Sequence, residues 1–111
     1  MSLDITFKHV RPVLCPHCGK HVTEETVGVE DSGGRVWYPF LESIGYYVPY
    51  DLRTEENDWY GKDMALTREQ TEELYHFVRR NAGSLYGPDP IRELVAYALA
   101  EGGTVKVNAD W

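Results

Sequence analysis

Two cysteines near the start of the chain are the residues whose type and spacing most clearly suggest chemistry. They lie in the segment Cys15–Lys20, which has the sequence CPHCGK. Two thiolates at this spacing can bind one metal ion, as in one half of a zinc ribbon or a rubredoxin-like site. Cys15 and Cys18 are the only cysteines, so a four-ligand zinc site needs two further ligands. His9 and His21 flank the turn and could complete a Cys2His2 set.

Two alternatives for this turn stay open. The first is a hairpin turn that resembles a zinc ribbon but keeps both thiols free. The second is a redox-active pair, although thioredoxin-like pairs begin a helix whose dipole lowers a thiol pKa, and here a strand is expected to follow. The N-terminal residues show no basic region followed by an apolar one, so we expect no signal peptide and a cytoplasmic location. Cysteines in that compartment are reduced or metal-bound rather than joined in a structural disulfide.

A second candidate site lies at the start of the first predicted helix. Ser32, Gly34 and Arg35 could hold a small anion, because backbone N–H groups at a helix N-terminus and a nearby guanidinium group favour negative charge. Tyr38 and Trp59 would cover the planar part of such a ligand by stacking. The alternative is an ordinary capping turn, since the glycines match neither the P-loop nor the dinucleotide-binding pattern.

The sequence indicates binding rather than catalysis. It has no HExxH motif, no HxE motif followed by PCxxC, and no recognisable Ser/His/Asp set. An enzyme would need carboxylates or His76 to gather in a cleft with Arg35. Residues 24–73 carry thirteen carboxylates against four Lys or Arg, which argues against binding to duplex nucleic acid, because that requires a basic face. No apolar run has the length of a membrane span.

The elements that must position these residues are typical of one α+β domain covering residues 1–111. Alternating apolar residues predict a first strand over 3–10 that could extend to 14, and the Val- and Thr-rich stretch 21–30 predicts its hairpin partner. Helices are expected from Ser32 to Gly45, from a capping box at Thr67 to near Asn81 or Gly83, and from Pro88 to Gly102, followed by a short strand over 104–107. We therefore expect a small antiparallel sheet, formed by the N-terminal hairpin and the C-terminal strand, packed with about three helices on one face.

The stretch 46–66 has no clear periodicity, although it is rich in aromatic and acidic residues. A segment of this length without regular structure is unusual in a small domain and is often functional. We expect residues 51–66 to be the least stable part of the chain and to order on binding. The alternative is that its rings, Trp59 and Tyr60 among them, pack on the sheet as ordinary core.

The order of these pieces resembles a group of small uncharacterised proteins from phages and mobile elements of Gram-positive bacteria. The matching pieces are Cys15–Gly19, Ser32–Tyr46 and Ile91–Val107. Members of the group commonly carry Asn-Ile-Thr-His-Asn before the first helix, where this chain has Ser-Gly-Gly-Arg-Val at positions 32–36. The resemblance implies a phage-encoded protein of the host cytoplasm that binds host factors or sequesters a nucleotide-like ligand.

The sequence thus predicts a small binding protein whose partner is a small anionic ligand or a host protein. The alternative function is a zinc-knuckle module, structural or used for protein interaction, with zinc as its only cofactor. A homo-oligomer is compatible with both, because residues from a neighbouring chain could complete either site.

Overall fold

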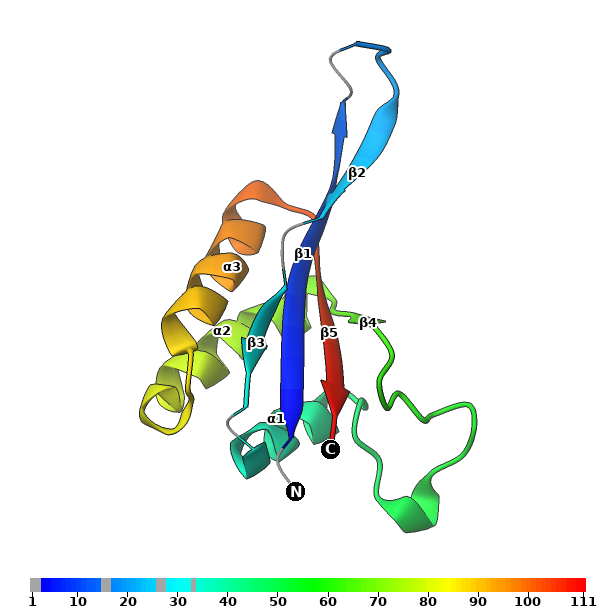
Figure 1. Cartoon of the computed structure of the whole chain (residues 1–111), viewed down its shortest axis with the longest axis vertical. Helices are drawn as coiled ribbons and strands as arrows, with labels where there is room; N and C mark the ends of the chain where they lie inside the picture. Colours follow the sequence, from blue (N-terminus) through cyan, green and yellow to red (C-terminus); the bar gives the residue numbers. More distant parts are fainter. Residues whose placement is uncertain (1–2, 15–16, 26–27, 33) are drawn as a thin grey trace.

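The computed structural model describes residues 3–14, 17–25, 28–32 and 34–111, although the side chains of His21 and Glu24 are not described. The chain folds as predicted into an α+β domain with an antiparallel sheet and three α-helices (Figure 1). The strands are β1 (Asp4–Leu14), β2 (His21–Glu25), β3 (Val29–Asp31), β4 (Met64–Ala65) and β5 (Thr104–Asp110). The α-helices are α1 (Tyr38–Ser43), α2 (Arg68–Arg80) and α3 (Pro88–Glu101), and the short 3-10 helices are η1 (Gly34–Trp37), η2 (Tyr50–Leu52) and η3 (Ala82–Ser84).

Strand β1 is the centre of the sheet. It pairs antiparallel with β5 along one edge, and with β2 and then β3 along the other, while β4 lies on the far edge of β5. The strand predicted over 21–30 is therefore two strands. Gly28 lies between them so close to β1 that a Cβ there would be 2.8 Å from Cγ2 of Thr6. Glycine within a strand weakens regular pairing and marks such close approaches of two chains.

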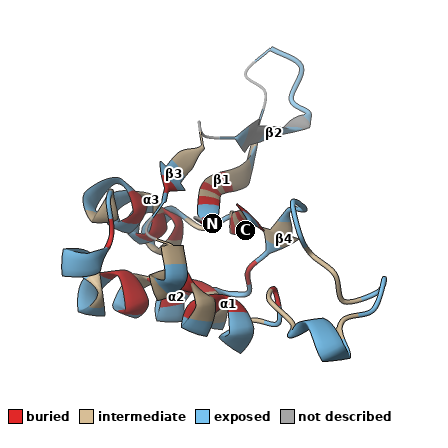
Figure 2. Cartoon of the chain, turned by 60° about the horizontal axis from the view of Figure 1, so that its bottom comes forward, coloured by how far each residue is buried: buried red, intermediate tan, exposed pale blue. Residues whose placement is uncertain are grey.

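One face of the sheet is buried beneath the helices, as Figure 2 shows. Alternation along β1 directs Ile5 and Phe7 toward the helices, and Leu3, just before the strand, continues the same buried row. Val105 and Val107 of β5 lie on the same face. Strand residues alternate between faces with a period of two, so the expected pattern of buried and solvated positions is confirmed. Helices α2 and α3 contact each other, and their buried side chains complete the core on this face of the sheet.

The β1–β2 hairpin extends beyond the rest of the sheet, as the upper end of the molecule in Figure 1 shows. The β5 strand begins at Thr104, opposite Val10, so residues 11–14 of β1 pair with β2 alone among the described strands. Leu14 and Val22 are 62% and 46% exposed there. The described residues of the turn, 17–20, therefore lie at the end of a projecting arm rather than in the body of the domain.

Two of the predicted helix ends are confirmed in detail. Thr67 and Gln70 form a reciprocal capping box at the start of α2. Gly45 has a φ of +77° after α1, and its N–H and that of Tyr46 donate to the carbonyls of Glu42 and Leu41. This pair of bonds is the Schellman motif, which favours glycine because of the left-handed backbone.

The start of the first helix differs from expectation. Ser32 does not cap it, because its Oγ donates a hydrogen bond to the Asp4 carboxylate at 2.8 Å. The chain instead enters through the 3-10 turn η1, and α1 follows with Pro39 in its first turn. None of the helices in the described parts of the chain is long and apolar enough to cross a membrane.

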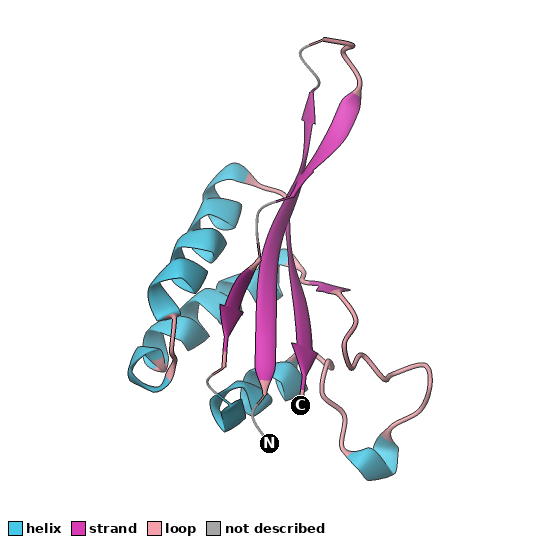
Figure 3. Ribbon diagram, in the orientation of Figure 1, coloured by secondary structure: helices cyan, strands magenta, loops and turns pink. Residues whose placement is uncertain are grey.

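Residues 46–63, here called the acidic loop, run from the end of α1 to β4 and project beside the sheet (Figure 3). The loop carries five Asp or Glu against Arg53 and Lys62. Its regular structure is the single 3-10 turn η2.

Candidate functional site

The predicted zinc ligands that the structure describes, His9 and Cys18, lie in different parts of the molecule. Cys15 lies outside the described residues, as does the side chain of His21, while Cys18 is exposed. His9 is 1% exposed, and its Nε2 donates to the Gly102 carbonyl oxygen at 2.7 Å. His9 lies five strand positions before Leu14, the last residue of β1, which is a distance of roughly 17 Å at about 3.3 Å per residue.

His9 therefore belongs to the core of the domain and does not join Cys18 at the end of the arm. The inward direction of odd-numbered residues in β1 decides its place, because this row continues the buried positions of Ile5 and Phe7. Among the described residues, no three His, Cys, Asp or Glu side chains gather closely enough to hold a metal ion.

The predicted anion-binding turn is built around a buried carboxylate. Asp31 is 2% exposed, and its Oδ2 accepts a hydrogen bond of 2.7 Å from Nε1 of Trp37. Its Oδ1 accepts bonds of 2.8 Å each from the backbone N–H groups of Tyr86 and Gly87. Gly34 has a φ of +69° in this turn, and Arg35 is exposed beside it. The polar groups here join β3, η1 and the start of α3, which is a structural role.

The two aromatic residues predicted to cover the ligand contact different neighbours. Tyr38 packs edge-on against Tyr47, with ring centroids 4.7 Å apart, and burial and the nearby Tyr47 raise the pKa of its phenol. Trp59 packs against Tyr46 at 6.4 Å. Both neighbours contact Trp111, at 5.2 Å from Tyr47 and 6.2 Å from Tyr46. The predicted pair thus belongs to a larger aromatic cluster around the last residue of the chain.

Arg53 is the functional candidate that the sequence did not indicate. Its guanidinium carbon lies 5.8 Å from the ring centroid of Tyr47 and 5.6 Å from that of Trp111. Its Nε and Nη2 both donate to the Val48 carbonyl, at 3.1 and 2.9 Å. Cation–π contacts and these bonds fix the base of the acidic loop. A lone Arg in an acidic stretch gives no sign of a ring that lies 58 positions later in the chain.

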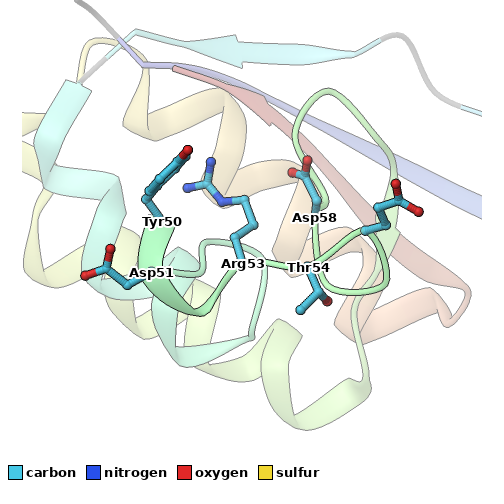
Figure 4. Close-up of a pocket in the computed structure, with 6 residues that line it drawn as sticks. Tyr50, Asp51, Arg53, Thr54 and Asp58 are labelled. Atoms are coloured by element: carbon cyan, nitrogen blue, oxygen red, sulfur yellow. The ribbon is translucent and has the colours of Figure 1, made fainter.

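An open pocket of about 690 Å³ lies beside Arg53 (Figure 4). The figure shows Arg53 between Tyr50 and Asp58, with the Asp51 carboxylate directed away from the guanidinium group. Arg53 forms no ion pair with any described carboxylate. The lining residues are Tyr50, Asp51, Arg53, Thr54, Glu55 and Asp58.

The outer part of the loop exposes apolar side chains next to these carboxylates. Tyr50 is 84% exposed and Leu52 is 67% exposed. Both belong to η2. In this turn the N–H of Leu52 donates a hydrogen bond to the Pro49 carbonyl, and the N–H of Arg53 donates one to the Tyr50 carbonyl. The exposed side chains therefore project from a turn that is itself hydrogen-bonded.

The inner part of the loop is tied to β5. The Tyr46 hydroxyl donates toward the carbonyls of Lys62 and Ala109, at 2.7 and 3.1 Å, and accepts from the Ala109 N–H at 2.7 Å. Burial raises the pKa of this phenol, so the hydroxyl stays protonated and able to donate at neutral pH. Gly61 donates its N–H to the Ala109 carbonyl at 2.9 Å.

Hydrogen exchange is expected to divide the acidic loop at about Trp59. The amides of residues 51–58 form only local or side-chain hydrogen bonds near solvent, as at Thr54 and Asn57, and should exchange fast. The Gly61 amide should show protection close to that of β5, because it is bonded to that strand. Mass spectrometry or NMR measures both. Uniformly fast exchange through residue 63 would contradict this division and support the expectation that the whole segment is unstable alone.

Comparisons of the chain with protein-family models, with curated proteins and with solved structures find no match.

Proposed function

We propose that this chain is a binding protein that recognises a basic protein segment through the acidic loop. The observation that carries the proposal is the exposure of Tyr50 and Leu52, at 84% and 67%, on a turn whose base is fixed by Arg53. The backbone of this turn is already hydrogen-bonded, and a preformed turn loses less conformational entropy when a partner covers it. Tyrosine is also among the residues that contribute most at protein interfaces.

The charge around these side chains favours a cationic partner. Asp51, Glu55 and Asp58 line the pocket beside Tyr50, so a Lys or Arg side chain of the partner would meet opposite charge there. Arg53 offsets only part of this charge, and its guanidinium group already contacts two rings and the Val48 carbonyl. Of the two partners expected from the sequence, a protein is thus better supported than a small anion.

The turn at residues 31–37 gives less support to an anionic ligand. The Ser32 hydroxyl donates to Asp4, and the Trp37 side chain donates to Asp31. An anion near this turn would also lie close to the buried Asp31 carboxylate, and like charges repel.

A fluorescence titration with a labelled peptide tests the proposal. We expect a peptide of alternating Lys and Leu to bind, and the matched peptide of Glu and Leu not to bind. The variants Tyr50→Ala and Asp58→Asn should weaken binding by about tenfold and a few-fold, because a central aromatic contributes more than an exposed charge.

The control is Tyr86→Ala, which removes a tyrosine that is also exposed, at 82%, but lies outside the acidic loop. It should bind the basic peptide as the parent chain does. Equal affinity of Tyr50→Ala and the parent chain would refute the proposed surface.

A further inference from the structure

A groove lies between α1 and α2, away from the acidic loop. Its volume is about 360 Å³, within the range of about 300–1,000 Å³ that is usual for ligand pockets. Phe40 and Phe77 line it, with ring centroids 5.5 Å apart, and Pro39 and Val36 add apolar surface. The groove can therefore receive an apolar side chain.

Cationic side chains lie at one end of this groove. Arg80 lines the groove and also a neighbouring hollow of about 350 Å³, which His76 and Arg79 share. Arg80 is paired with Glu73 at 2.8 Å, and both side chains are more than half exposed. Arg79 lies 5.7 Å from the Tyr75 ring and forms no ion pair with a described residue. Glu73 also lines the groove, so the Arg80–Glu73 ion pair lies at its rim, and Arg79 in the neighbouring hollow adds a positive charge that no described carboxylate pairs with.

The turn η2 has the complementary character. It presents exposed Tyr50 and Leu52 next to the carboxylates of Asp51 and Glu55. The groove instead has an apolar lining, with Pro39 and Val36 more accessible than the largely buried Phe40 and Phe77, next to Arg79 and Arg80. We propose that the partner of the acidic loop is a second copy of this chain, whose α1–α2 groove receives Tyr50 and whose α2 arginines face the carboxylates. This inference rests on the proposed function, because it names the partner of the same loop.

The placement of the two surfaces allows a closed pair. Figure 2 shows α1, α2 and the outer part of the acidic loop on the same lower side of the molecule. Two copies related by a two-fold axis can then exchange η2 turns reciprocally, which buries both grooves and leaves no free docking surface. Each loop pocket gains its cations from the other copy.

Analytical ultracentrifugation over a range of concentrations tests the inference. We expect a dimer in equilibrium with monomer, and Tyr50→Ala should raise the dissociation constant by about tenfold or more. Tyr86→Ala, which removes a tyrosine of similar exposure elsewhere, should leave it unchanged. A chain that is monomeric at every concentration, or a dimer that Tyr50→Ala does not weaken, would overturn the inference.

Charge reversal gives a second measurement on exposed residues that leave the core intact. The double variants R79E/R80E and D51K/E55K should each dissociate, because like charges then face each other. Their mixture should form a heterodimer, since one of its two contacts pairs the parent residues and the other pairs the two reversed sets. Failure of the mixture to associate would count against the predicted contact.

The basic peptide separates this inference from the proposed function. A monomeric parent chain that binds the Lys/Leu peptide overturns the dimer alone. R79E/R80E keeps its acidic loop, so it should bind that peptide as a monomer if the proposed function is right. A dimer that does not depend on Tyr50, together with no peptide binding, overturns both.

Discussion

The variant Asp31→Ala is expected to lower the free energy of unfolding by about 3–6 kcal/mol, because three hydrogen-bond donors lose their acceptor. Two of these donors are backbone N–H groups, of Tyr86 and Gly87, and the third is Nε1 of Trp37. The carboxylate is 2% exposed, so water cannot easily replace it. A domain of this size has a total stability of about 5–15 kcal/mol, so this one change could unfold it.

Asp31→Asn keeps the experiment interpretable if the alanine variant does not fold. The amide has nearly the same shape but one acceptor oxygen instead of two. We therefore expect Asp31→Asn to lower the free energy of unfolding by about 2–3 kcal/mol. Urea unfolding followed by tryptophan fluorescence measures both variants.

The control for this experiment is Asp4→Asn, which changes an exposed carboxylate that accepts one bond from Ser32. It should change stability by less than about 1 kcal/mol. Similar losses at positions 4 and 31 would show that the buried contacts contribute little.

The variant Gly103→Ala is expected to have the second large effect. Gly103 has a φ of +92°, and a Cβ there would lie 2.6 Å from the Val10 carbonyl oxygen and 2.8 Å from Nε2 of His9. The first of these atoms belongs to the central strand and cannot turn aside as a flexible side chain can. We expect Gly103→Ala to lower the free energy of unfolding by about 3–5 kcal/mol, because backbone strain and overpacking act together.

Gly102→Ala provides the matched control. This neighbouring glycine has a similar φ of +83°, yet nothing lies within 4 Å of the position of its Cβ. Gly102→Ala should lower the free energy of unfolding only by the cost of backbone strain, about 1–3 kcal/mol. The difference between the two variants in urea unfolding therefore measures the close contact with β1, and equal losses would contradict it.

Local sequence patterns predicted most of the regular elements because their causes are local. The capping box of Thr67 and Gln70 and the glycine after α1 involve residues within a few positions of each other. The alternation of Leu3, Ile5 and Phe7 likewise follows from strand geometry. Ser32 was wrongly assigned as the helix cap because its actual acceptor, Asp4, lies 28 positions away in the sequence.

The candidate sites depended on longer-range packing and were harder to predict. His9 is near the CPHCGK turn in the sequence, but its side chain points into the core and bonds to Gly102. Tyr38 and Trp59 were identified as aromatic residues of interest, whereas the cluster that joins them requires Trp111. Arg53 can fix the base of the acidic loop only because two rings of that cluster, Tyr47 and Trp111, lie beside its guanidinium group.

The sequence by itself determined the α+β class, the hairpin formed by β1 and β2, the ends of α2 and α3, and an acidic aromatic loop between the first two helices. These properties follow from hydrophobic periodicity, capping residues and composition, which act over a few neighbouring positions. Only the tertiary structure decided that Asp31 joins three segments and that Trp111 packs under Arg53. Contacts between residues distant in sequence depend on how strands and helices pack, and no short stretch of the chain contains that information.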